Sequence, residues 1–189
     1  MRLFVAINLP PETRDAIYAD TAPLRVATSA VKWVAAPLLH VTLKFLGERS
    51  DVLLPDLENI IRIVAARQPA LDLRTTHYGA FPNFRRARVV WLGMTGETEL
   101  RALAQDLDQM FEGFGISRET RVFRAHLTLG RLKGEMSPDE SRVLAAAAAL
   151  PREARSVAVR TVDLMQSELG SGGPRYSILA SAPLHARGP

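Results

Sequence analysis

The segment HVTLKFLG (residues 40–47) has a close copy in HLTLGR (residues 126–131). Both begin with His-x-Thr-Leu, although the chain of 189 residues contains only 4 histidines. β-branched and apolar residues fill the first segment, which ends at Gly47, and this pattern is typical of a strand. The copies therefore predict two similar strands, each of which carries one histidine.

The surroundings of these two motif strands are repeated as well. His40 and His126 lie 86 residues apart (126 − 40), and further pairs have the same offset: Arg2 with Arg88, and Arg74-Thr75 with Arg160-Thr161. Each half is predicted to run strand, helix, motif strand, helix, strand, which indicates an internal duplication. We expect a single two-lobed domain made of two similar halves, about 1–81 and 88–167, plus a C-terminal strand.

Periodicity and turn residues place the remaining elements. We predict strands at 3–9, 71–81, 88–94, 156–165 and 175–182, and helices at 11–27, 54–68, 100–114 and 138–150. Ser137 and Glu140 form a predicted capping box, with Pro138 at the first position of the last helix. The expected fold class is α+β, a bilobal pseudo-twofold duplication in which two mainly antiparallel sheets, flanked by helices, surround a central cleft.

Composition excludes several kinds of site. The chain has no cysteine, which excludes disulfides, thiolate metal sites and a cysteine nucleophile. The apolar run at the N-terminus is short and ends at Pro10, so we expect no signal peptide or membrane span, and a cytoplasmic location. A net charge of +4 and a pI near 9.9 favour anionic partners. We expect a monomer that uses no metal and no cofactor.

Side-chain alternation orients the first motif strand. Residues i and i+2 of a strand share a face. His40, Thr42 and Lys44 are therefore predicted to point together, whereas Phe45 and the residues between them point into the apolar layer beneath the helices.

His126 and Thr128 are predicted to share a face of the second motif strand in the same way. If the twofold brings the two strands face to face, two imidazoles and two hydroxyls meet across one cleft. An in-line phosphoryl displacement needs a base for the nucleophile, an acid for the leaving oxygen and donors for the phosphoryl oxygens. Neutral and charged imidazole coexist near pH 7, so the two histidines can divide the acid and base roles without a metal.

These motifs resemble those of the two-histidine phosphoesterase superfamily, and in particular its RNA 2′,3′-cyclic phosphodiesterase branch, also called 2′-5′ RNA ligases. The resemblance extends to RLFVAINLP (2–10), GAFPNFRRARVVWLG (79–93) and SELGSGGPRYSIL (167–179). It implies a bilobal fold with both motifs in a central cleft. It also implies metal-independent opening of a 2′,3′-cyclic phosphate to a 2′-phosphomonoester, with reversible 2′-5′ joining of RNA ends.

The resemblance assigns roles to the motif residues. Carried over by motif, His40 is the implied proton donor and His126 the implied proton acceptor. Thr42 and Thr128 are implied to hold the substrate phosphate. One departure is Ala125, where members of the family commonly have proline directly before the second histidine.

Further candidate substrate contacts lie around the motifs. Arg131 follows His126 by five residues, so strict alternation turns it to the opposite face unless a bulge or twist intervenes. Lys44 is a candidate because of its predicted face. The segment FPNFRRARVVW (81–91) mixes aromatic and basic residues that either stack bases and neutralise phosphates or form a solvated loop. Its candidates are Phe84, Arg85, Arg86 and Arg88. His77 and His185 lie outside both motifs and are expected bystanders.

The sequence thus predicts a phosphodiesterase that acts on RNA ends or small cyclic nucleotides. Two alternatives remain. A non-catalytic RNA-binding module is one, because basic α+β sheets commonly bind RNA; the paired histidines argue against it, since such platforms use aromatic residues where this chain has His-Thr pairs. A related phosphodiesterase for another small 2′-5′ or cyclic phosphate substrate is the other.

Overall fold

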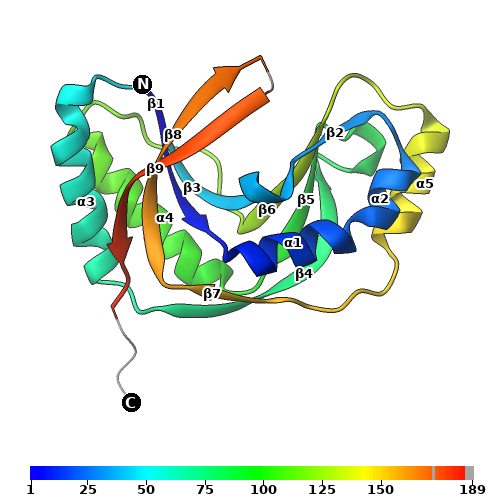
Figure 1. Cartoon of the computed structure of the whole chain (residues 1–189), viewed down its shortest axis with the longest axis horizontal. Helices are drawn as coiled ribbons and strands as arrows, with labels where there is room; N and C mark the ends of the chain where they lie inside the picture. Colours follow the sequence, from blue (N-terminus) through cyan, green and yellow to red (C-terminus); the bar gives the residue numbers. More distant parts are fainter. Residues whose placement is uncertain (172, 186–189) are drawn as a thin grey trace.

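Two antiparallel sheets form the framework of the protein (Figure 1). The structure, a computed structural model, describes residues 1–171 and 173–185. The strand order is β3-β1-β8-β9 in the first sheet and β2-β6-β5-β4-β7 in the second. The strands are β1 (Arg2–Asn8), β2 (Val31–Trp33), β3 (His40–Glu48), β4 (Leu71–Phe81), β5 (Val89–Met94), β6 (His126–Leu132), β7 (Ser156–Val159), β8 (Thr161–Gly170) and β9 (Gly173–Pro183).

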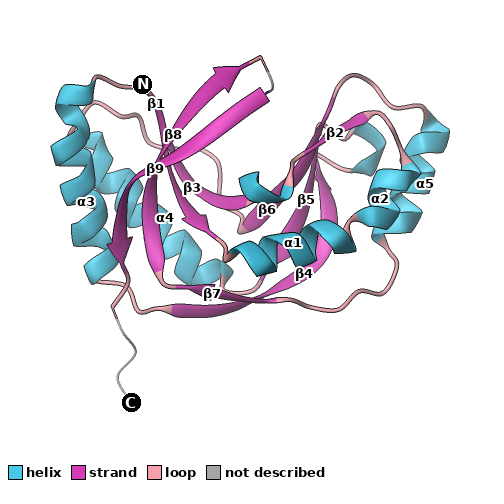
Figure 2. Ribbon diagram, viewed as in Figure 1, coloured by secondary structure: helices cyan, strands magenta, loops and turns pink. Residues whose placement is uncertain are grey.

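Helices flank both sheets, so the predicted fold class is confirmed (Figure 2). Two helices lie along the first sheet, and the other three lie beside the second. In chain order they are α1 (Pro11–Asp20), α2 (Ala22–Ala27), α3 (Leu54–Ala66), α4 (Glu97–Glu112) and α5 (Pro138–Ala148). The motif strands β3 and β6 contact each other where the two sheets meet. No helix in the described ranges is both long enough and apolar enough to cross a membrane.

Each sheet contains strands from both halves of the sequence. β4, the last strand of the first half, pairs with β5 of the second half. β8, the last strand of the second half, pairs with β1 of the first. This exchange joins the two halves of the chain through two sets of backbone hydrogen bonds. That the halves 1–81 and 88–167 arose by duplication remains our proposal.

The apolar core follows the predicted periodicities. Side chains from both sheets and from all five helices meet in one buried cluster. The helix residues that recur at helical spacing are buried: Leu57, Ile60, Ile61 and Val64 in α3, and Leu100, Leu103, Leu107 and Phe111 in α4. The predicted capping box is present at the start of α5, where the Ser137 hydroxyl accepts a hydrogen bond from the Glu140 N–H and the Glu140 carboxylate accepts from the Ser137 N–H. These elements were correctly predicted because their signals are local.

Two predicted elements are each divided in the structure. The helix expected at 11–27 breaks at Thr21, because Pro23 has no N–H to continue the α1 hydrogen-bond pattern. The strand expected at 156–165 breaks at Arg160, where the chain leaves the second sheet and enters the first. The Arg160 guanidinium donates to the Leu71 carbonyl and to the Asp72 carboxylate at this crossing. The short strand β2 was not predicted.

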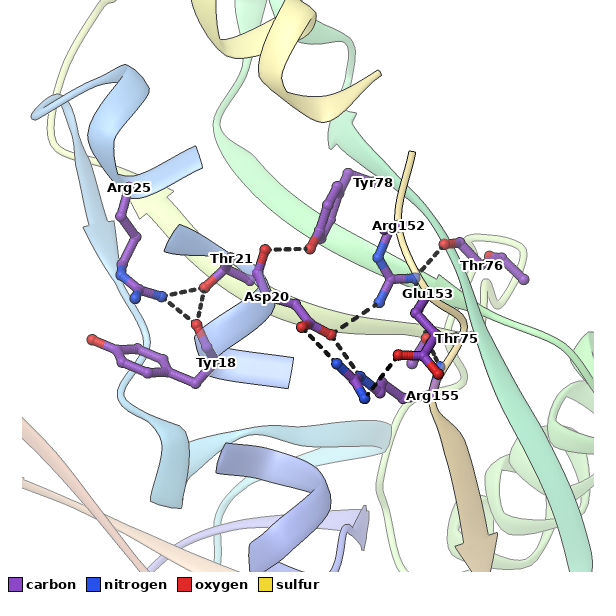
Figure 3. Close-up of polar contacts among 10 residues, drawn as sticks. All are labelled: Tyr18, Asp20, Thr21, Arg25, Thr75, Thr76, Tyr78, Arg152, Glu153 and Arg155. Atoms are coloured by element: carbon purple, nitrogen blue, oxygen red, sulfur yellow. Dashed lines mark hydrogen bonds and ion pairs between the residues drawn. The ribbon is translucent and has the colours of Figure 1, made fainter. Parts of the chain in front are cut away.

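A polar network fastens the end of α1 to the second sheet (Figure 3). The Arg155 guanidinium donates to both carboxylate oxygens of Asp20, at 2.8 and 2.9 Å. The Tyr78 hydroxyl on β4 donates to the Asp20 carbonyl at 3.1 Å, and Arg152 donates to the Thr76 carbonyl at 2.6 Å. The network therefore fixes the segment that connects β1 of one sheet with the helices of the other.

The predicted orientation of Lys44 is wrong because β3 contains a bulge. Lys44 pairs with Val5 and Thr42 pairs with Ala6, which leaves Leu43 as the extra residue. Lys44 is therefore buried, away from the face that carries His40. Its ammonium group donates to the carboxylate of Asp108 on α4, and to the Ser117 carbonyl at 2.6 Å. Lys44 is withdrawn as a substrate contact.

The Lys44–Asp108 ion pair should contribute far more to stability than an exposed pair on the same helix. We expect Asp108→Ala to lower the free energy of unfolding by about 3 kcal/mol, because it leaves a buried ammonium group without its counter-charge. Glu112→Ala removes a pair with Arg118 whose side chains are each 55% exposed, and should cost less than about 1 kcal/mol. Urea denaturation of both variants measures the difference. Equal losses would show that the buried pair has no special role.

Candidate active site

Each motif strand begins with its histidine, and the two imidazoles are held in the same way. His40 Nδ1 lies 2.8 Å from the Leu38 carbonyl, and His126 Nδ1 lies 2.7 Å from the Arg124 carbonyl. A carbonyl only accepts hydrogen bonds, so Nδ1 carries the proton in both rings. Each Nε2 is therefore the nitrogen available for proton transfer, and His40 Nε2 lies 3.1 Å from the Thr42 hydroxyl.

Aromatic side chains fix the planes of both imidazoles. Phe4 lies 5.1 Å from the His40 ring, and Tyr176 meets that ring edge-on at 5.2 Å. On the other lobe, Phe81 meets the His126 ring edge-on at 5.1 Å. These contacts restrict ring rotation, so the two Nε2 atoms have defined directions.

The surroundings lower the pKa of both histidines from their ordinary value of 6.5. Burial is the main cause, because it removes water from the charged imidazolium, and the hydrogen bonds to the Leu38 and Arg124 carbonyls oppose it. The positive charge of Arg131 lowers both pKa values further, and the charge of His126 also lowers the pKa of His40. The two imidazoles thus interact electrostatically, and both are mainly neutral at pH 7 in the free protein.

The threonines occupy the predicted positions. We call the sheet faces that carry His40 and His126 the inner faces. Thr42 follows His40 by two residues, before the bulge, and both are half-buried on the inner face of β3. Thr128 follows His126 in the same way on β6, where it pairs with Trp91 of β5. Two His-Thr pairs are therefore brought to the junction of the two sheets.

A second bulge brings Arg131 onto the inner face of β6. Val90 pairs with Gly130 and Trp91 pairs with Thr128, which leaves Leu129 as the extra residue. Arg131 is exposed and close enough to influence both histidines. The sequence left open whether a bulge turns Arg131 toward the face of His126, and the structure contains that bulge.

Phe45 occupies the corresponding position on the first motif strand, 86 residues before Arg131. The bulge at Leu43 turns Phe45 out of the apolar layer, so its predicted burial is wrong. Its side chain is 61% exposed, and its ring lies 6.3 Å from that of Phe4. One lobe therefore adds a cation to the inner face and the other adds an aromatic ring.

The basic segment after β4 is only partly available to a ligand. Phe84 packs against the hydrophobic core, and its carbonyl accepts a hydrogen bond from the Ser141 hydroxyl. Its side chain is half-buried, and its contact with substrate remains a prediction. Arg85, Arg86 and Arg88 are exposed, and their contact with substrate remains a prediction.

A small cavity adjoins His126. Its volume is about 130 Å³, and its walls include His77 and Trp91, whose rings lie 5.4 Å apart, edge to face. His77 was expected to be a bystander because it lies outside both motifs. The pairing of β4 with β5, which no local pattern indicates, brings it to this cavity. In residues 1–171 and 173–185, no three His, Cys, Asp or Glu side chains are grouped so as to hold a metal ion.

Comparison with known proteins shows similarity along nearly the whole chain. The model of the 2′-5′ RNA ligase superfamily matches residues 13–170. An RNA 2′,3′-cyclic phosphodiesterase of Methanothermobacter thermautotrophicus is 34% identical over 177 residues, which cover 94% of this chain and 95% of the relative. One of Escherichia coli is 38% identical over 133 residues, covering 69% and 71%.

Solved structures are similar over the same length. A protein of Thermus thermophilus superposes with a TM-score of 0.79 at 30% identity, and the match covers 100% of both chains. Escherichia coli LigT in complex with 3′-AMP superposes with a TM-score of 0.72 at 32% identity, covering 97% of each chain.

The electrostatics of the site can be tested by NMR titration of the histidine rings. We expect His40 and His126 to titrate below pH 6.5, because burial and Arg131 disfavour their charged forms. Arg131→Gln removes one positive charge and should raise both midpoints. Arg142→Gln, at an exposed position on α5, is the control and should leave them unchanged. Midpoints at or above 6.5, or no response to Arg131→Gln, would contradict this picture.

Proposed function

The chain belongs to the 2′-5′ RNA ligase superfamily, and on that premise we propose that it is an RNA 2′,3′-cyclic phosphodiesterase whose acid and base are His40 and His126. It hydrolyses a 2′,3′-cyclic phosphate to a 2′-phosphomonoester. The observation that carries this proposal is the matched pair of imidazoles on two contacting strands, each with Nδ1 bound to a backbone carbonyl, which leaves Nε2 as the nitrogen for proton transfer.

The reaction divides between the two histidines. Following the family resemblance, His126 accepts a proton from the attacking water and His40 donates a proton to the departing 3′ oxygen. The new P–O bond forms as the P–O3′ bond breaks, which leaves the phosphate on the 2′ oxygen. The free protein holds both imidazoles mainly neutral at pH 7. An anionic phosphate between them favours the imidazolium and so supplies the acid.

Neighbouring groups stabilise the charge that develops on the phosphoryl oxygens. The hydroxyls of Thr42 and Thr128 share the inner faces with the histidines and can donate hydrogen bonds to these oxygens. Arg131 adds a positive charge to the same side of β6. Arg85, Arg86 and Arg88 are exposed and extend the positive charge toward a longer RNA.

The first alternative, a non-catalytic RNA-binding module, fits the geometry less well. A non-catalytic RNA-binding module has no need for two imidazoles with buried surroundings and matched hydrogen bonds. A phosphodiesterase for another small 2′-5′ or cyclic phosphate substrate would use the same atoms and differ only in what surrounds them. We extend the proposal to a cytoplasmic monomer that acts on RNA ends.

Turnover of a simple cyclic nucleotide tests the proposed function. With 2′,3′-cyclic AMP as substrate, the expected product is 2′-AMP, which phosphorus NMR distinguishes from 3′-AMP. No turnover, or mainly 3′-AMP, would contradict the proposal.

In the same assay, His40→Asn and His126→Asn should each lower kcat by about 10² to 10⁴, because each loses one proton-transfer partner. The double variant should lose much less than the product of these factors, because one substitution already disables the concerted step. His185→Asn is the matched control and should behave like the unaltered protein. Circular dichroism checks that each variant is folded. Near-normal activity in either motif variant would assign the repeated His-x-Thr to architecture alone.

A further inference from the structure

The inner face of the first sheet continues from His40 onto the hairpin that β8 and β9 form. Tyr176 of β9 meets the His40 ring edge-on at 5.2 Å. It pairs with Ser167 of β8, which pairs in turn with Arg2 of β1. Residues directly opposite each other on antiparallel strands point to the same side of the sheet. Arg2, Ser167 and Tyr176 therefore form a row across the inner face, and this row begins beside His40.

Two large apolar side chains on the same face are exposed to solvent. Ile178 follows Tyr176 by two residues, with no bulge between them, and is 54% exposed. Leu169 follows Ser167 by two residues and is 76% exposed. Because alternate residues of a strand share a face, both lie on the side of Tyr176. We call Arg2, Ser167, Leu169, Tyr176 and Ile178 the hairpin face.

The hairpin projects beyond the rest of the first sheet (Figure 1). β1 pairs with β8 only as far as Ser167, so residues 168–170 and 173–175 pair only with each other in the described part of the chain. Helix α3 packs against β8 and β9 through the main core, which lies on the opposite face. A ligand longer than one nucleotide can therefore continue from His40 along the hairpin face.

The charge of the hairpin face suits a phosphodiester chain. Arg2 is exposed, and its guanidinium has no ion-pair partner within residues 1–171 and 173–185. Glu48 lies opposite Arg2 on β3, but its carboxylate pairs with the terminal ammonium of Met1 at 3.7 Å instead. The Ser167 hydroxyl next to Arg2 adds a neutral donor. Sites for single-stranded RNA combine such donors for phosphates with aromatic rings on which bases stack, and Tyr176 supplies the ring.

We propose that the hairpin face binds the nucleotides that precede the cyclic phosphate at the end of an RNA. The proposal rests on the proposed function and names its substrate class, an RNA chain of more than one nucleotide. The cyclic end lies between the two histidines, and the RNA leaves the cleft across Tyr176. Its bases contact Tyr176, Ile178 and Leu169, and Arg2 and Ser167 contact a phosphodiester.

Substrates of different length test the proposal. One is 2′,3′-cyclic AMP, and the other is an adenosine trinucleotide that ends in the same cyclic phosphate. We expect kcat/KM of the unaltered protein to be about tenfold higher for the trinucleotide, because its additional bases stack on the hairpin face. Equal values of kcat/KM for the two substrates would overturn the proposal.

Two substitutions on the hairpin face should act on the longer substrate alone. Arg2→Gln and Ile178→Ser should each raise KM for the trinucleotide about fivefold and leave kcat and KM for cyclic AMP unchanged. Arg175→Gln is the matched control for the charge, because Arg175 is exposed on the opposite face of the same hairpin. Val143→Ser, at a position on α5 that is 52% exposed, is the control for the apolar side chain. Neither control should change KM for either substrate.

Three kinetic results would contradict the proposal. Unchanged KM for the trinucleotide in both Arg2→Gln and Ile178→Ser would leave the hairpin face without a role. Equal effects of Arg2→Gln and Arg175→Gln would reduce the role of Arg2 to general positive charge. A preference for the trinucleotide that is lost in Arg86→Gln but kept in Arg2→Gln would place the RNA on the second lobe.

Binding of the product separates this proposal from the proposed function. A trinucleotide that already carries the 2′-phosphate needs no turnover, so calorimetry gives its Kd whether or not the protein is active. If the unaltered protein hydrolyses neither substrate, the proposed activity falls, and the Kd alone decides the role of the hairpin face. A Kd about fivefold weaker in Arg2→Gln, with the slope of log Kd against log salt reduced by about 0.7, supports that role. Equal Kd values in Arg2→Gln and the unaltered protein overturn it.

Discussion

The exchange of β4 and β8 between the two sheets is the constraint on which the site depends. Because β4 pairs with β5 and β8 pairs with β1, each sheet contains strands from both halves of the chain, and the two halves cannot separate without breaking a ladder of backbone hydrogen bonds. The motif strands β3 and β6 lie in different sheets and contact each other where the sheets meet. The network around Asp20 and Arg155 reinforces this by tying α1 to the second sheet. Rigid sheets suit a reaction that needs an acid and a base on opposite sides of one phosphorus.

The two halves hold their histidines through the same contacts but differ in the residue that follows each bulge. In both lobes, Nδ1 is bound to the carbonyl two residues earlier, an aromatic ring packs against the imidazole, and a bulge follows at the third residue after the histidine. These bulges bring different residues onto the inner faces: Phe45 on β3 and Arg131 on β6. Burial and the positive charge of Arg131 disfavour both imidazoliums, and in the proposed mechanism a bound phosphate favours the charged form that acts as the acid.

Sequence patterns predicted the features that depend on local signals. The helices α3, α4 and α5, the motif strands and the two His-Thr pairs all follow from periodicity, capping residues and alternation. The features that the sequence could not predict depend on how the strands pair with one another. The bulge at Leu43 sends Lys44 to Asp108, and the break at Arg160 moves the chain from one sheet to the other. His77 becomes part of a wall beside His126 only because β4 pairs with β5, which no local pattern records.

The central claim is that both imidazoles act on one phosphorus. A crystal structure with 2′-AMP bound tests this most directly. We expect one phosphate between the lobes, with oxygens within about 3 Å of Nε2 of both His40 and His126 and of the Thr42 and Thr128 hydroxyls. A phosphate bound to only one imidazole, or bound away from the junction of β3 and β6, would contradict the two-histidine mechanism.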